Sequence, residues 1–276
     1  MHEAWFDRLK SLEDGEAANP RGLATHEELD ARLEFDAEWN ILDVPARKLN
    51  YRFMVAEWLW MSFGRNDLAT LAQYNSQMSR FSDDGLTLTG AYGPHIVAHK
   101  DWVLDRLRRD PMTRQAVLEI KRPYLEHTKD EPCTLSLQFL CRDGELHCIA
   151  NMRSSDVWLG VPYDAFAFSQ IQNALTGELG VNRGWTSIRM GSSHLYEVNA
   201  PAAQELLEER YFEDDNHDTI RSPALPGWPP AWLEHVLVHR RLPFYPEIID
   251  RPWINYARVL VASTSAEALA ILKEMS

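Results

Sequence analysis

The chain has 276 residues, enough for one large domain or two small ones, and for a core that needs no disulfide or metal support. Apolar residues make up 45% and charged residues 25%, which excludes a disordered chain, and no run of apolar residues is long enough to cross a membrane. The net charge of −13 argues against binding of duplex nucleic acid, because such binding needs many Lys and Arg side chains to neutralise phosphates.

Two further features indicate the compartment. The N-terminal residues, MHEAWFDRLK, carry charges where a signal peptide has an apolar stretch. The three cysteines, Cys133, Cys141 and Cys148, do not form a disulfide framework, and no C-x-x-C pair is present to hold zinc. We therefore expect a cytoplasmic protein without a metal.

The first half of the chain favours helices. Residues 1–50 read as a helix followed by an extended stretch, with a turn at 19–22. Residues 51–63 have helical length and are apolar on nearly every side, which predicts a buried helix and a buried carboxylate at Glu57. Another helix is expected near 97–109, before Asp110-Pro111.

The middle of the chain favours strands, at 114–121, 133–141, 145–152 and 185–198. Alternation over 133–141 predicts one shared face for Cys133, Leu135, Leu137, Phe139 and Cys141. The turn Arg142-Asp143-Gly144 predicts a hairpin between the second and third of these strands.

A helix over 163–177, a Pro-rich loop over 223–230 and a closing helix with the capping box Thr264 and Glu267 complete the pattern. Strands and helices in mixed order, without βαβ regularity, predict an α+β fold.

Six separated motifs occur in one order. They are Glu131-Pro132-Cys133, Gln138-Phe139, Asp143-Gly144, Arg153-Ser154-Ser155-Asp156, Leu159-Gly160-Val161-Pro162 and Gly191-Ser192-Ser193-His194-Leu195-Tyr196. Together with Glu57-Trp58-Leu59-Trp60, Gly64 and Tyr92-Gly93, they resemble the thymidylate synthase family over roughly residues 20–200. The resemblance implies a single catalytic domain over 1–276, with a large mixed, twisted sheet packed by helices, and a sheet-to-sheet homodimer. Residues 201–276 diverge from the family.

The resemblance implies roles for three residues near the reacting base. Cys133 would add to carbon 6 of a pyrimidine, chemistry that suits a thiolate because it forms near neutral pH and leaves readily. Glu57 would move protons, its pKa raised by burial, and Tyr92 would order that proton network. Cys133 as a small buried residue, and Tyr92 as an aromatic packed on Pro94, remain the structural alternatives.

The resemblance also implies a nucleotide site. Its residues would be Arg21, Arg153 and Ser154 on the phosphate, Arg114 supplied by the neighbouring subunit, His194 and Tyr196 on the sugar hydroxyl, and Asp156. Guanidinium suits the phosphate because its fork of donors matches the oxygens. The family usually has two adjacent arginines where this chain has Arg114-Gln115, so one contact is lost or replaced. A surface charge for each arginine and a packed strand for the histidine–tyrosine pair are the alternatives.

The co-substrate implied by the resemblance is 5,10-methylenetetrahydrofolate. Its slot would be formed by Trp60, Asp156, Leu159, Gly160 and Tyr163, with Asp156 accepting from the pterin. Core packing explains Trp60 and Leu159 equally well.

One departure bears on the substrate. Thymidylate synthases have Pro-Phe-Asn where this chain has Pro162-Tyr163-Asp164. Asparagine complements uracil, whereas aspartate can accept from the amino group at carbon 4 of cytosine, so Asp164 resembles the cytidylate (dCMP/CMP) 5-hydroxymethyltransferase branch. An N-terminal helix cap is the alternative role for Asp164.

Other departures concern the last step. Thr134 and Met152 replace a histidine and a glutamine, residues 81–85 replace a tryptophan-rich loop, and residues 272–276 lack the family's apolar tail. A wetter pocket favours water over hydride. The sequence thus predicts a homodimeric dCMP hydroxymethyltransferase, with CMP as an alternative nucleotide. A dCMP methyltransferase, a thymidylate synthase acting on dUMP, and a silent nucleotide-binding protein are its rivals.

Overall fold

The computed structural model describes residues 1–121, 128–212, 219–242 and 250–276. The main sheet has the strand order β1-β2-β8-β6-β5-β4, with β7 pairing β8, and a small second sheet pairs β3 with β9. The strands are β1 (Glu16–Ala18), β2 (Thr25–Asp36), β3 (Trp39–Leu42), β4 (Val117–Glu119), β5 (Thr134–Arg142), β6 (Glu145–Met152), β7 (Ser155–Asp156), β8 (Asn182–Tyr196) and β9 (Thr219–Arg221).

The sheet is mixed, because one pair at its centre is parallel. Strands β2 and β8 are antiparallel over most of their length, and β5 and β6 form the predicted hairpin. Strands β6 and β8 run parallel, joined by a crossover through α5 (Val161–Leu179), so the chain contains one βαβ unit that the sequence pattern did not indicate. The predicted α+β fold class is confirmed, since the remaining long pairs of the sheet are antiparallel.

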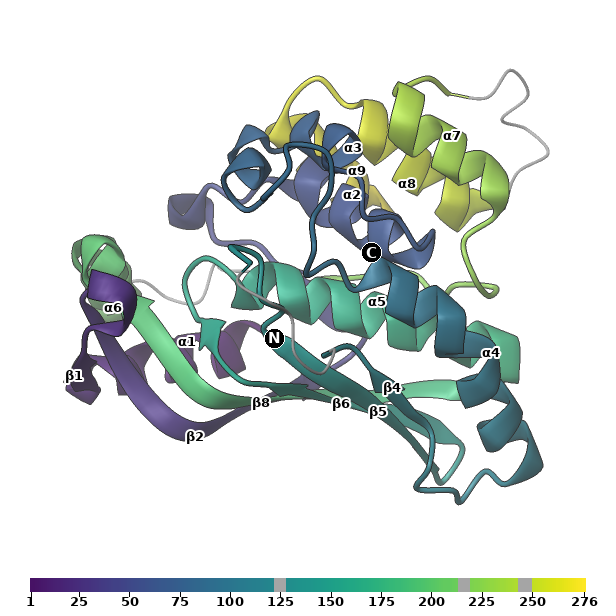
Figure 1. Cartoon of the computed structure of the whole chain (residues 1–276), viewed down its shortest axis with the longest axis horizontal. Coiled ribbons are helices and arrows are strands. Elements are labelled where there is room, and N and C mark those ends of the chain that lie inside the picture. Colours follow the sequence, from purple (N-terminus) through teal and green to yellow (C-terminus); the bar gives the residue numbers. More distant parts are fainter. Residues whose placement is uncertain (122–127, 213–218, 243–249) are drawn as a thin grey trace.

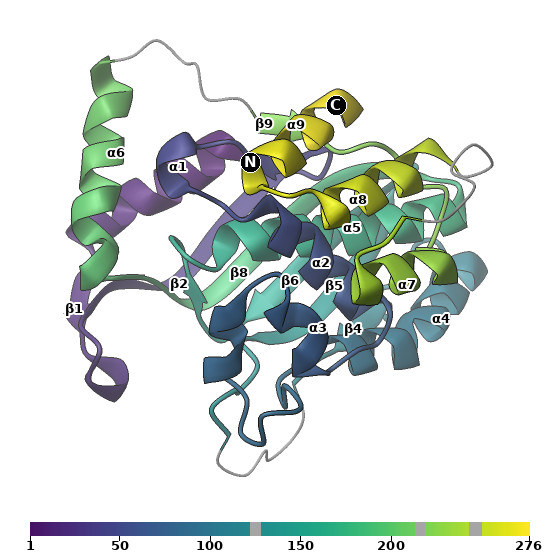
Figure 2. The ribbon, with the colours of Figure 1, turned by 90° about the horizontal axis from the view of Figure 1, so that it is seen from above.

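The helices lie in layers above one face of the sheet (Figure 1). They are α1 (His2–Ser11), α2 (Tyr51–Ser62), α3 (Leu68–Ala72), α4 (Gly93–Arg109), α5, α6 (Ala200–Phe212), α7 (Ala231–His239), α8 (Arg251–Val261) and α9 (Ser265–Met275). Helix α5 lies along the sheet, and α2, α8 and α9 form a further layer over it (Figures 1 and 2). In the described parts of the chain no helix covers the opposite face of the sheet (Figure 1), and none is long and apolar enough to cross a membrane.

Local sequence explains where several helices begin. The side chain of Asn50 accepts a hydrogen bond from the Phe53 amide at 3.1 Å and caps the buried helix α2. Helix α4 starts at Gly93, earlier than predicted, because Pro94 fits the first helical turn. Thr264 caps α9 by accepting from the Glu267 amide, as predicted, while the Glu267 carboxylate accepts from the amide of Ser263.

The predicted face of the strand at 133–141 is wrong at one position. The register between β5 and β6 shifts between Thr134 and Ser136, as in a β-bulge. Leu135 is therefore turned outward and is 36% exposed, whereas Thr134 is fully buried. Leu137 and Phe139 keep the predicted buried face. The strand expected over 114–121 is also shorter and spans β4 alone.

A second irregularity lies in the parallel pair, where the register of β6 and β8 shifts between Leu146 and Cys148. The ring of His147 stacks on Trp185 at 4.5 Å, and its Nδ1 accepts the Trp185 amide at 3.2 Å. This ring occupies the space that a side chain at Gly184 would need, because a Cβ there would lie 2.2 Å from Nδ1.

Candidate active site

The topology brings the predicted site residues to one end of the sheet. Cys133 directly precedes β5, and Arg153 and Ser154 directly follow β6, which is antiparallel to β5. Strand β7 then pairs with the end of β8, so that Asp156 lies opposite His194. Helix α5 begins at the same end, five residues after β7.

The Cys133 thiol lies beside two of its predicted neighbours. Its Sγ is 3.6 Å from an Nη of Arg153 and 3.9 Å from the Ser154 hydroxyl. The Arg153 guanidinium also donates to the carbonyls of Glu131 and Pro132, which holds it against the segment that leads to the cysteine. Burial raises the pKa of the Cys133 thiol, and the positive charge of Arg153 opposes that rise.

Two carboxyl groups, those of Glu57 and Asp164, influence each other's surroundings in the site. Burial, with a smaller contribution from the charge of Asp164, raises the pKa of Glu57 to about 8. Burial, with a smaller contribution from Asp156, raises the pKa of Asp164 to about 7. Among the described residues, none donates a hydrogen bond to the carboxyl of Glu57 or Asp164. Both groups are therefore poised to exchange protons near neutral pH.

Asp164 does not cap a helix. The N-cap of α5 is Gly160, and the Asp164 amide donates to the Gly160 carbonyl at 3.0 Å inside the first turn. A Cβ built on Gly160 would lie 3.5 Å from Oδ2 of Asp164, so the carboxyl lies close over this glycine. The capping alternative is thereby excluded for this residue, and its carboxyl is left available to a ligand.

Asp156 is partly satisfied by the loop that follows it. Its Oδ1 accepts the amides of Trp158 and Leu159, each at 2.8 Å. Its Oδ2 is buried and has no hydrogen-bond partner among the described residues. Burial raises the pKa of Asp156, and the charge of His194 opposes the rise. The unpaired oxygen is suited to a donor on a ligand.

Tyr92 is connected to the segment that carries Cys133. Its hydroxyl accepts the Thr134 amide at 3.3 Å, and burial raises its pKa, with further contributions from Asp164 and Cys133. The Thr134 hydroxyl itself is buried without a partner among the described residues. Tyr92 thus contacts the residue after Cys133 instead of serving only as packing for its own loop.

Of the residues expected on the phosphate and sugar, Arg21 influences Cys133, and His194 and Tyr196 pack on each other, whereas Arg114 lies at the exposed sheet edge. The charge of Arg21 reaches Cys133 and adds a small contribution against the rise in the pKa of its thiol, although Arg21 is exposed and has a left-handed backbone with φ of 56°. His194 and Tyr196 pack edge to face at 5.2 Å. Arg114 is exposed before the edge strand β4, and its carbonyl accepts from Gln138 at 3.0 Å.

The residues expected in the folate slot differ in exposure, from Leu159 at the surface to Trp60 in the core. Leu159 is 50% exposed at the rim, beside Gly160. The Tyr163 hydroxyl accepts the Asn50 amide at 3.0 Å, and its ring packs edge to face on Phe53. Trp60 is only 2% exposed and donates its indole N–H to the Asp67 carbonyl, so the structure places its ring in the core.

Sequence reasoning missed Arg47. Its guanidinium lies 4.3 Å from the centre of the Trp158 ring and donates to the Trp158 carbonyl. Its charge also reaches Asp156 and Tyr163. A basic residue in a Pro45-Ala46-Arg47 turn just before the buried helix was the available signal. Among the described residues, no group of three or more His, Cys, Asp or Glu could hold a metal ion.

The loop that replaces the tryptophan-rich segment is held by its own aspartates. Asp84 accepts the amides of Leu86 and Thr87 at 2.8 and 2.7 Å. Asp83 accepts from Thr128 and Lys129, which belong to the segment leading to Cys133. The loop is therefore folded on itself and fixed to a neighbouring segment.

Comparisons with known proteins agree with this geometry. The sequence profile of the family described as thymidylate synthase matches residues 9–217, a range that contains every predicted site residue. The deoxyuridylate hydroxymethyltransferase of Bacillus phage SP01 is 32% identical over 219 residues. That alignment covers 70% of this chain and 56% of the phage protein, so the chain spans little more than half of its relative's length.

Proposed function

The chain belongs to the thymidylate synthase family, and on that premise we propose that it is a deoxycytidylate 5-hydroxymethyltransferase. It would transfer a one-carbon unit to carbon 5 of dCMP, with CMP as the alternative nucleotide, and water would complete the 5-hydroxymethyl product. The observation that carries the proposal is the largely enclosed carboxyl of Asp164, which accepts no hydrogen bond from a described residue and whose pKa is raised.

Cys133 begins the reaction in this proposal. Its thiol loses a proton, and the thiolate adds to carbon 6 of the base, which makes carbon 5 nucleophilic. Arg153, 3.6 Å from the sulfur, stabilises the thiolate form. Glu57, whose pKa burial raises to about 8, takes up and returns protons at the base.

Asp164 reads the base. With its pKa raised to about 7, the carboxyl holds its proton part of the time at neutral pH. It can accept from the amino group at carbon 4 of cytosine, and when protonated it can donate to N3. Against uracil the ionised carboxyl would meet the oxygen at carbon 4, acceptor against acceptor, whereas the protonated carboxyl could donate to that oxygen, so the discrimination belongs to the ionised form. Such an unpaired buried group costs about 1–3 kcal/mol, or more when charged.

The folate co-substrate, 5,10-methylenetetrahydrofolate, would supply the one-carbon unit. The unpaired Oδ2 of Asp156 fits a donor on the pterin, and the exposed Leu159 with Gly160 and Tyr163 fits a flat ring. Trp60, buried in the core, would support this slot from behind.

Water as the final reactant is supported by the loop around Asp83 and Asp84. Its hydrogen bonds fix it to residues 128–129, and the tryptophans that would shield the pocket are absent from its sequence. Water therefore meets less of a barrier than in a sealed site.

The proposed assembly is a homodimer of one 1–276 domain per subunit. The face of the main sheet that no described helix covers is available to a second copy (Figure 1). Arg114, exposed at the edge of this sheet, would reach the partner's phosphate together with that subunit's own Arg21, Arg153 and Ser154. His194 and Tyr196 would hold the sugar hydroxyl.

A second candidate is hydroxymethylation of dUMP, favoured by the name of the phage relative. Purified protein with the folate donor and dCMP, CMP or dUMP separates the two, and mass spectrometry distinguishes hydroxymethyl from methyl products. Asp164→Asn should shift preference toward dUMP by about 10²-fold or more. An unchanged preference would discard the base-reading role. Absence of tritium release from carbon 5 of every labelled nucleotide would indicate a silent binding protein.

A further inference from the structure

We propose that residues 219–227, called the strap below, position helix α5 and through it the carboxyl of Asp164. This inference rests on the proposed function, because it gives the strap a role in reading the base. The strap begins beyond the residues that match the family profile, which end at 217.

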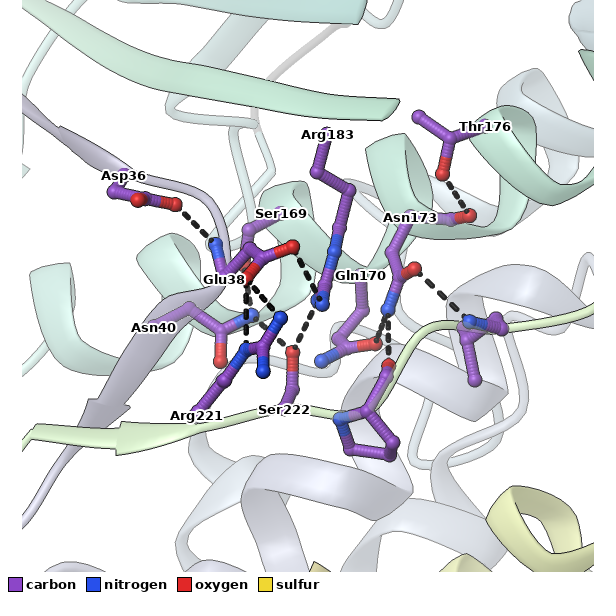
Figure 3. Close-up of polar contacts among 12 residues, drawn as sticks. Asp36, Glu38, Asn40, Ser169, Gln170, Asn173, Thr176, Arg183, Arg221 and Ser222 are labelled. Atoms are coloured by element: carbon purple, nitrogen blue, oxygen red, sulfur yellow. Dashed lines mark hydrogen bonds and ion pairs between the residues drawn. The ribbon is translucent and has the colours of Figure 1, made fainter. Parts of the chain in front are cut away.

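Helix α5 carries an unusual set of polar side chains in its middle. Ser169, Gln170 and Asn173 are each 0% exposed, although a helix enclosed by the core is expected to be apolar there. Most buried polar side chains have a hydrogen-bond partner. Oε1 of Gln170 accepts from Asn173 at 3.2 Å, while its Nε2 has no partner among the described residues. Figure 3 shows this set directed toward the strap.

Asn173 makes the most direct contact with the strap. Its Nδ2 donates to the Pro223 carbonyl at 2.9 Å, and its Oδ1 accepts the Leu225 amide at 3.1 Å (Figure 3). One amide side chain thus satisfies two backbone groups of the strap, an acceptor and a donor two residues apart. This pairing fixes the strap both along and across the helix axis.

Ser222 makes a second connection through Asn40. The Asn40 amide donates to Ser169 of α5 at 2.7 Å and to Ser222 of the strap at 3.1 Å. Arg183 donates to the same Ser222 hydroxyl at 3.0 Å and pairs with Glu38 at 3.3 Å (Figure 3). Helix and strap are therefore joined at two levels.

Gly177 lets the strap approach the helix backbone. A Cβ at this position would lie 2.3 Å from the Leu225 carbonyl and 2.5 Å from the Gly227 amide. Any larger residue must push the strap away from α5. The contact is therefore close as well as hydrogen-bonded.

A displacement of α5 at the strap would also move the other end of the helix. Asn173 lies nine positions after Asp164, or about 13 Å along the helix at ~1.5 Å per residue. Because α5 is one continuous helix from Val161 to Leu179, a shift at the strap moves its N-terminal turn as well. Asp164 is in that turn, and a misplacement of about 1 Å in a site can cost ~10²-fold in rate.

Two variants test the strap. Asn173→Leu removes both hydrogen bonds to it, and Gly177→Ala displaces it without removing any. Thr176→Val is the matched control, because the Thr176 hydroxyl donates to the Asn173 carbonyl inside the helix and not to the strap. The kcat, the KM and the dissociation constants for dCMP and dUMP are measured for each variant, together with thermal unfolding.

We expect Asn173→Leu and Gly177→Ala to lower kcat/KM by about ten- to a hundredfold and to reduce the preference between the two bases. Thr176→Val should lose some stability while keeping kcat/KM within about twofold. Asn173→Asp keeps the acceptor for Leu225 but sets its second oxygen against the Pro223 carbonyl, so it should restore part of the activity only at a pH low enough to protonate this carboxyl.

If the strap variants fold and keep the wild-type kcat, KM and base preference, the strap is only structural and the proposal is wrong. Should Asn173→Leu fail to fold, Gly177→Ala and Asn173→Asp decide the matter by the same readouts. A wild-type enzyme that prefers dUMP would overturn the proposed substrate alone. The role of the strap is then tested by how many fold the strap variants lower kcat/KM with dUMP as the substrate.

Discussion

The two halves of helix α5 use polar residues in opposite ways. At its N-terminal turn, Asp164 is largely enclosed near Glu57, and no described residue donates a hydrogen bond to either carboxyl. In its second half, Asn173 is fully buried, whereas Asp164 is partly exposed, and both ends of the Asn173 side chain are paired with the strap. The difference separates residues that we propose to take part in the reaction, which would destabilise the fold at neutral pH, from residues that hold two segments together.

This contrast predicts opposite mutational signatures. Substitutions at the reacting end should remove activity and leave stability unchanged or improved, whereas substitutions at the strap end should reduce stability first. Each of the following variants tests one side of the comparison.

The largest effect is expected at Cys133, the proposed nucleophile. Cys133→Ser should lower kcat by ~10⁴-fold or more, because the alcohol ionises far less readily than the thiol. Stability should change by less than about 0.5 kcal/mol, since the side chain is only partly buried and similar in size. Product formation and tritium release report the first quantity and urea unfolding the second. If the variant keeps a kcat within about tenfold of wild type, Cys133 is not the nucleophile.

Glu57→Gln should separate activity from stability. Loss of proton transfer should lower kcat by about 10²–10⁴-fold. In the unfolded chain the carboxyl ionises at about pH 4.3, but in the folded protein its pKa is raised to about 8. The stability that the protonated group contributes is complete below the first value and is lost as the pH rises through the second.

The Glu57→Gln variant does not lose this stability as the pH rises, because glutamine stays neutral. Its stability relative to wild type should therefore increase between pH 5 and pH 8, by about 1–3 kcal/mol. Urea unfolding at the two pH values measures the change. A relative stability that is flat or falls with pH contradicts a buried, protonated Glu57.

The smallest effect is expected in the strap. Ser222→Ala removes the acceptor for Asn40 and Arg183 at a fully buried position. We expect a loss of about 1–2 kcal/mol in the free energy of unfolding. The loss should be equal at pH 5 and pH 8, since neither the hydroxyl nor the amide titrates there. A loss of stability at only one of the two pH values would contradict this prediction, because it would show that the contacts of Ser222 depend on a titrating group, as expected at Asp164.

Local pattern predicted much of this molecule. The apolar residues around Glu57 indicated the buried helix, and the turn at Asp143-Gly144 indicated the hairpin. The structure then brings Cys133, Arg153 and Ser154 together, as the ordered motifs led us to expect, although their roles remain predictions.

What the sequence could not predict depends on partners far along the chain. Leu135 was assigned to the buried face because alternation assumes a constant register, which the bulge breaks. The importance of Asn173 and Gly177 depends on backbone groups about fifty residues later, and neither position has a local signal. Arg47 likewise becomes notable only once Trp158 lies beneath it.

The histidine that fills the place of a side chain at Gly184 constrains any redesign of the uncovered sheet face. In a library that diversified this face, even alanine at position 184 would require the His147 ring to move, because the added methyl group would lie 2.2 Å from its Nδ1. A smaller residue at 147 would have to be chosen together with a larger one at 184. The two positions should therefore be varied as a pair.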